Sequence, residues 1–148
     1  MPIHPFLVHF TLSLTLLFAG IEILPALRTR IPERGQRLIG AAAVLFMGLA
    51  VLTGWLSLSA LRDRGISIPA AASFHRLLAL SGSAFLVLLW IADMRRSRLS
   101  PLLSRSIAIA GLLLLLGAAG MGGHLVYDDR LGTATAAPSS SAAPASLP

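Results

Sequence analysis

Four long runs of apolar residues constrain this chain more than any other feature of its sequence. They cover residues 6–27, 38–61, 73–94 and 102–126, and short charged or polar segments separate them. A run of about 20 apolar residues forms a helix of about 30 Å, the thickness of the hydrocarbon core of a bilayer. The chain is therefore expected to be an all-α, polytopic membrane protein that forms a four-helix transmembrane bundle.

The composition agrees with this expectation. Of the 148 residues, 55% are hydrophobic and 12% are charged, whereas soluble domains carry about 25% charged residues. The length leaves room for one domain, and we expect the four-span bundle to occupy residues 1–132. Residues 133–148 are rich in Ala, Ser and Pro and have little to bury, so a disordered tail is expected there.

The first run is too long for a signal peptide and lacks a basic segment before it, so it is expected to remain as a span.

The arginines predict the orientation in the membrane. All 12 basic residues are Arg, and eight of them lie in the two links that follow the first and third runs. Short cytoplasmic loops carry an excess of basic residues. Both links are therefore expected in the cytoplasm of a bacterium and both termini outside its inner membrane. No basic stripe is interleaved with aromatic residues, so the expected partner is the lipid bilayer and not a nucleic acid.

This topology places all four histidines on one side of the membrane. His4 and His9 open the first run, His75 opens the third, and His124 closes the fourth. Imidazole binds metals and haem iron, and the chain has no Cys, which excludes thiolate sites and covalent c-type haem. We therefore expect a non-covalent haem b with axial ligands drawn from His9, His75 and His124. His9 and His75 are the first choice, with His124 as a substitute.

Small residues and spacing refine this site. Gly120 and Gly117 precede His124 on the same helix face and leave a slot for another helix or a flat macrocycle, so Gly120 is expected to line the cofactor. His4 lies about 140° from His9 around an ideal helix, and with Pro5 between them it is expected to cap the helix or face water. A copper, zinc or iron site that uses His4, His9, His75 and His124 is an alternative. Interfacial histidines that bind backbone carbonyls and each other are another.

Acidic residues are interpreted more simply. Glu22 lies inside the first run, where a carboxylate is either protonated, paired with an Arg of the first link, or part of a proton relay. Asp93 lies next to the basic second link and needs no special role. Asp128 and Asp129 follow His124 and are expected to be solvated acids, with binding of a hard divalent cation or hydrogen bonding to His124 as the alternatives.

The motifs around these histidines resemble a family of small bacterial membrane proteins known as domain of unknown function 2231. The resemblance rests on the opening His4-Pro5-Phe6-Leu7-Val8-His9-Phe10, on His75, and on Gly122-Gly123-His124-Leu125-Val126-Tyr127, and it covers residues 1–132. It implies four membrane helices and no established activity. Some members are associated with Rieske and cytochrome systems, which favours a redox role. Members often carry a histidine and a glycine after the last motif, where this chain has Asp129 and Arg130.

The expected function is electron transfer through the haem, with a periplasmic redox protein or other membrane subunits as partners. One alternative is a non-catalytic accessory or anchoring subunit whose histidines satisfy one another. Another is a metal-binding or transport component. Paired internal repeats or broken helices would favour transport, and the sequence shows neither clearly.

Overall fold

The structure, a computed structural model, describes residues 3–95 and 99–127. Within these ranges every regular element is a helix: α1 (Ile3–Ile23), α2 (Pro25–Arg30), α3 (Glu33–Asp63), α4 (Ala70–Met94) and α5 (Pro101–Tyr127). In this part of the chain α1, α3, α4 and α5 are long and apolar enough to cross a membrane. The expected four-span bundle is therefore confirmed. The expected tail over residues 133–148 lies outside the described residues.

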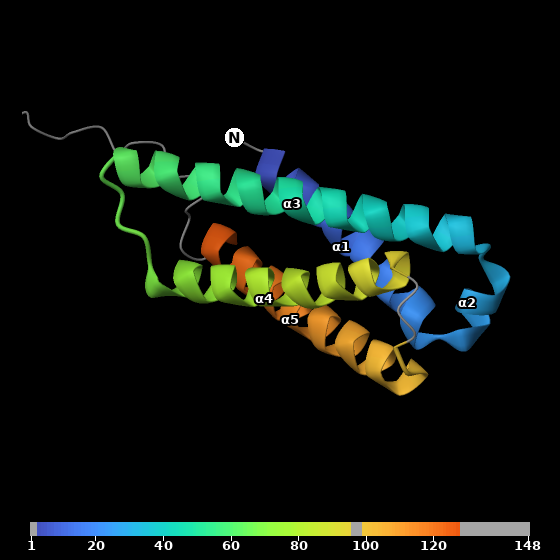
Figure 1. Ribbon diagram of the computed structural model, residues 1–148. Helices are drawn as coiled ribbons and strands as arrows, with labels where there is room; N and C mark the ends of the chain where they lie inside the picture. Colours follow the sequence, from blue (N-terminus) through green and yellow to red (C-terminus); the bar gives the residue numbers. More distant parts are fainter. Residues whose placement is uncertain (1–2, 96–98, 128–148) are drawn as a thin grey trace, which may run out of the picture.

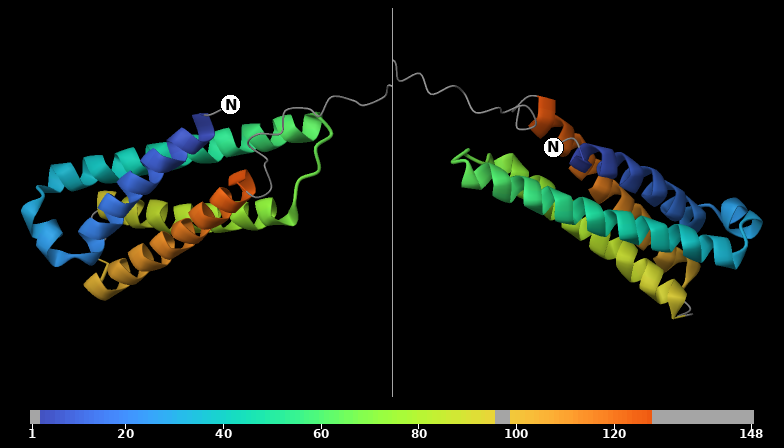
Figure 2. Two further views of the ribbon diagram at one scale, coloured as in Figure 1. Left: turned by 180° about the vertical axis from the view of Figure 1, so that it is seen from behind. Right: turned by 90° about the horizontal axis from the view of Figure 1, so that it is seen from above.

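The four long helices form a ring in which each contacts two neighbours. The most extensive packing joins α4 to α5 and α1 to α3, while α1 with α5 and α3 with α4 pack less extensively. The bundle thus consists of two antiparallel hairpins, α1–α3 and α4–α5 (Figure 1). Figure 2 shows that the start of α1, the end of α3, the start of α4 and the end of α5 lie towards one end of the bundle.

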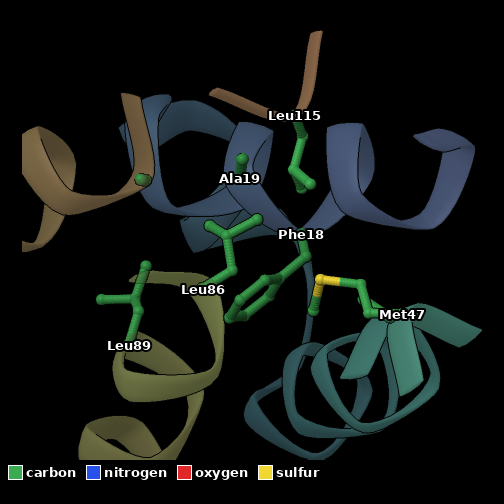
Figure 3. Packing of buried hydrophobic residues seen from close by; sticks show 8 residues of the cluster. Phe18, Ala19, Met47, Leu86, Leu89 and Leu115 are labelled. Atoms are coloured by element: carbon green, nitrogen blue, oxygen red, sulfur yellow. The ribbon is translucent and has the colours of Figure 1, made fainter. Parts of the chain in front are cut away.

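The core lies at the centre of this ring. Phe18 of α1, Met47 of α3, Leu86 of α4 and Leu115 of α5 meet there, each at most 6% exposed (Figure 3). Inside the α4–α5 hairpin the backbones approach closely, because a Cβ on Gly82 would lie 2.9 Å from the carbonyl oxygen of Gly111. Small residues permit such contacts in membranes, where lipid already solvates apolar side chains and packing must hold the helices together.

Helix ends differ from the sequence prediction. The first span ends at Ile23 and not near residue 27, because Pro25 has no N–H and begins the separate helix α2 after an extended Leu24. Helix α4 begins at Ala70 behind Pro69, three residues before the apolar run that predicted it. Helix α3 starts at Glu33, five residues before the apolar run that predicted it, because charged residues at the membrane edge continue the helix.

The two hairpins carry similar residues at corresponding positions, and we call this correspondence the internal repeat. His75 and Asp93 of α4 follow His4 and Glu22 of α1 by the same 71 positions. The small and buried residues of α5 follow those of α3 by 68 positions. Between α1 and α4, the further matching residues are Thr11, Thr15 and Phe18 with Gly82, Leu86 and Leu89. Between α3 and α5, they are Gly40, Ala43, Met47, Ala50 and Gly54 with Ala108, Gly111, Leu115, Ala118 and Gly122. The sequence prediction found no clear repeat because substitutions such as Thr to Gly hide the match.

Candidate functional site

His4 joins the first hairpin at its histidine-bearing end. Its side chain is half-buried, and its Nδ1 lies 3.0 Å from Oγ1 of Thr53 on α3. The Thr53 hydroxyl donates to backbone carbonyls within α3, at 2.9 Å to Leu49 or 3.1 Å to Ala50, so it accepts the Nδ1–H of His4. The ring lies against Gly54, where a Cβ would be 3.0 Å from Cε1 of His4.

His4 therefore does not have the position expected from its sequence context. It lies within the first turn of α1, which begins at Ile3, and it neither caps the helix nor faces water. The reason is its register: His4 precedes the buried residues Thr11 and Thr15 by seven and eleven positions, and so it shares their core-facing stripe.

His75 makes the matching contacts in the second hairpin. Its Nδ1 lies 2.7 Å from the carbonyl oxygen of Ala118 on α5. A carbonyl only accepts, so Nδ1 carries the hydrogen and Nε2 keeps its lone pair. The His75 ring lies against Gly122, where a Cβ would be 3.1 Å from Cε1.

The two half-buried histidines thus form one pair across the hairpin boundary. The two side chains are close enough for their charges to interact. In both rings Nδ1–H is held by the partner helix of the same hairpin, which leaves Nε2 as the nitrogen with an available lone pair. We call His4 and His75 the histidine pair.

His9 lies outside this pair. Its side chain is exposed, and its Nδ1–H donates to the carbonyl oxygen of Pro5 one turn earlier in α1, at 2.7 Å. The five-residue spacing from His4 turns it about 140° away from the core-facing stripe. His9 and His75 were the first choice of axial ligands predicted from the sequence. In the structure, the side chain of His9 is exposed and that of His75 is half-buried.

The structure does not show the slot that was predicted between His124 and Gly120. His124 is exposed in the last turn of α5, and no atom lies within 4 Å of a Cβ placed on Gly120. The glycine that contacts an imidazole is Gly122, two residues before His124, and the imidazole is that of His75. The sequence indicated Gly122 as a packing residue and as part of the family motif, and not as a neighbour of His75.

A metal site with three or more ligands is not found in the described part of the chain, where no cluster of three His, Cys, Asp or Glu side chains is suitable. Of the four histidines proposed as metal ligands, the structure brings together His4 and His75. Asp128 and Asp129, predicted beside His124, lie outside the described residues.

A second charged group lies at the opposite end of the bundle. Glu22 is buried, and its Oε2 lies 2.6 Å from Nη1 of Arg28, which confirms the interpretation that it reaches an arginine of the first link. Nη2 of the same Arg28 lies 3.9 Å from Oδ1 of Asp93. One arginine therefore lies between two acids that occupy matching positions in the two hairpins.

Four apolar helices in two repeated hairpins, with polar side chains gathered at both ends, define a polytopic membrane protein. The chain belongs to the family described as predicted membrane protein (DUF2231), which matches residues 1–135. This confirms the resemblance inferred from the histidine motifs. No curated protein and no solved structure is significantly similar to the chain.

Several residues of the site were missed in the sequence. Thr53 lies inside an apolar run with nothing in its local pattern to mark it, and the small residues Gly54 and Ala118 indicate helix packing but no contact with a histidine. Ala50 and Gly54 match Ala118 and Gly122 at an offset of 68 positions, while His4 matches His75 at an offset of 71, so the two offsets together relate the contacts of both histidines. Thr53 has no such match, because Met121 occupies the corresponding position in α5.

Proposed function

We propose that this membrane protein transfers electrons through a b-type haem held by His4 and His75. The supporting observation is the histidine pair. One imidazole comes from each hairpin, both Nδ1–H groups are held by neighbouring helices, and both Nε2 lone pairs are left for a ligand bond. Histidines that bind metals typically donate the second ring N–H in this way, which fixes the tautomer and the orientation of the ring.

The donor set suits haem iron, which accepts neutral imidazole nitrogens as axial ligands. The histidine pair crosses the boundary between the hairpins, and packing across that boundary is less extensive than packing within each hairpin. A flat group would enter there with the least disruption. The proposal therefore replaces His9 by His4 as the partner of His75. Haem would supply the redox chemistry, while the hairpins would hold both imidazoles and keep water and lipid away from them.

The proposed location is the inner membrane of a bacterium, with the histidine pair on the periplasmic side. The support is the excess of arginine at the opposite end, which favours that end as the cytoplasmic one. A haem at the outer side would exchange electrons with a periplasmic redox protein or another membrane subunit.

The test is a reduced-minus-oxidised absorption spectrum of the full chain, purified in detergent after expression with haem supply. The expected result is a sharp α-band that is lost in both His4→Ala and His75→Ala. His9→Ala is the matched control, because this exposed imidazole bonds only within its own helix, and its spectrum is expected to equal that of the wild type. A folded wild-type protein that is colourless and binds no added haem would overturn the proposal and favour the accessory or anchoring subunit.

Transport is a second candidate, and the internal repeat favours it. Both hairpins start at the same end of the bundle, so they are parallel repeats, an arrangement found in several transporter families around a central substrate site. Proteoliposomes that contain the full chain and a metal-sensitive dye test this candidate with Zn²⁺ and Cu²⁺. Uptake that depends on both His4 and His75 would support transport, whereas dye response equal to that of empty liposomes would contradict it.

A further inference from the structure

The end of the bundle opposite the histidine pair contains a cavity of about 390 Å³. It lies where the end of α1, the short α2, the end of α4 and the start of α5 meet. We call it the charged cavity, and the residues that line it are Glu22, Pro25, Arg28, Thr29, Leu89, Ala92, Asp93, Leu99, Pro101, Ser104 and Arg105. Its volume falls within the range of sites that bind small ligands, about 300–1,000 Å³.

Four charged residues line the charged cavity, and two of them, Glu22 and Arg28, form an ion pair with each other. Glu22 and Arg28 form a close ion pair at 2.6 Å, and the Glu22 side chain is only 4% exposed. The Arg28 side chain is 46% exposed, so only the carboxylate of the pair is buried, and separating the pair would leave that carboxylate uncompensated.

The other two charges have no partner at hydrogen-bond distance, and Asp93 has only the distant Arg28. Asp93 lies 3.9 Å from Arg28, which is too far for a hydrogen bond, and within residues 3–95 and 99–127 its carboxylate accepts none. Arg105 lines the same cavity and pairs with no acid in those ranges. The guanidinium of Arg105 and the carboxylate of Asp93 do not approach each other within 4 Å, although both face one space.

A ligand that carries both a cation and an anion, separated from each other, would complement this arrangement. Because the charged cavity lies at the arginine-rich end of membrane-spanning helices and has apolar walls from Leu89, Ala92 and Leu99, we propose that it binds a phosphoethanolamine group. The phosphate oxygens would accept hydrogen bonds from Arg105, and the primary ammonium would donate to Asp93. Basic pockets between membrane helices on the cytoplasmic side are known places for lipid headgroups.

Phosphoethanolamine is distinguished from related headgroups by its donors and charges. A choline headgroup has no N–H to offer Asp93, and a glycerol headgroup carries no cation. The charged cavity is therefore expected to prefer phosphatidylethanolamine over phosphatidylcholine and phosphatidylglycerol with the same acyl chains. This inference does not depend on the proposed haem, because the two sites lie at opposite ends of the bundle.

Native mass spectrometry of the full chain in detergent, with the three lipids added in equal amounts, measures this preference. Asp93→Asn and Arg105→Gln are each expected to reduce phosphatidylethanolamine retention about tenfold, the loss that corresponds to one charge-assisted hydrogen bond. Arg34→Gln is the matched control, because Arg34 is an exposed arginine in the first link, at the same end of the bundle, and does not line the cavity. Circular dichroism of each variant verifies that the helices are intact. Equal retention of the three lipids, or an equal loss in Arg34→Gln, would overturn the proposal.

Thermal unfolding distinguishes a lipid from a soluble ligand. Stabilisation by phosphatidylethanolamine alone would assign the site to a lipid headgroup, and stabilisation by water-soluble phosphoethanolamine as well would show that the headgroup is sufficient. Both results are expected to disappear in Asp93→Asn and Arg105→Gln. No stabilisation of the wild type by either compound would overturn the proposal.

Discussion

Gly40 shows how a single residue sets the distance between two helices. A Cβ at this position would lie 2.5 Å from Cδ1 of Trp90 on α4 and 3.1 Å from Cε2 of Phe18 on α1. Both rings are bulky, and Phe18 belongs to the buried core cluster, so neither can move freely. The absence of a side chain at Gly40 therefore allows α3 to contact α4 beside the core.

Gly40→Ala is expected to destabilise the bundle by about 1–3 kcal/mol, the usual cost of overpacking a well-filled interior. Gly48→Ala in the same helix is the matched control, since no atom lies within 4 Å of its added Cβ. Unfolding in increasing fractions of a denaturing detergent measures both variants. Equal stability of the two variants would contradict the close contact with Trp90.

Gly122 tests how the His75 ring is held. Gly122→Ala places a methyl group 3.1 Å from Cε1 of His75, so the ring has to shift and its bond to Ala118 is expected to lengthen. Gly123→Ala, with nothing within 4 Å of the added Cβ, is expected to leave the ring unchanged. Nitrogen NMR of labelled histidine reports the effect, since the wild-type His75 is expected to carry its hydrogen on Nδ1. A wild-type His75 with Nε2–H would refute the assigned tautomer.

At the scale of whole helices, hydrophobic runs predicted the existence and number of the spans because length and apolar content alone decide whether a helix can cross a bilayer. The same runs did not give the contacts, because a residue that faces lipid and one that faces a neighbouring helix are both apolar. His4 illustrates this limit. Its neighbour Pro5 predicted a cap, whereas its spacing to Thr11 and Thr15, which places it on the buried stripe, became clear only with the packed helices.

The two hairpins hold their helices together by different means at matching positions. The Thr11 hydroxyl lies 3.0 Å from the carbonyl oxygen of Phe46 across the first hairpin and shares its one hydrogen with the Leu7 carbonyl of its own helix, at 2.9 Å. In the second hairpin, Gly82 contacts the Gly111 backbone. Thr11→Val is expected to cost about 0.6 kcal/mol, the average for such bonds in membranes. Gly82→Ala is expected to cost more, because its Cβ would meet a backbone oxygen at 2.9 Å that cannot rotate away. The same detergent unfolding assay ranks them, and the reverse order would contradict this comparison.

At the scale of the molecule, the arrangement of four spans places the two ends of the bundle on opposite sides of a membrane. The chain has no Cys, so single cysteines report topology without background. Ser67→Cys, in the segment between α3 and α4, is expected to react with a membrane-impermeant maleimide added outside intact spheroplasts. Ser100→Cys, before α5, is expected to react only after permeabilisation. Labelling of both from the same side would contradict the four-span topology.

The internal repeat allows each half of the molecule to be compared with the other position by position. The halves agree at His4 and His75 and differ at other positions. Arg28 corresponds by the 71-residue offset to Leu99, so one guanidinium serves two acids that sit in equivalent places. An arginine introduced at Leu99 would give Asp93 a cation of its own, and the unequal ends of this bundle would become more alike.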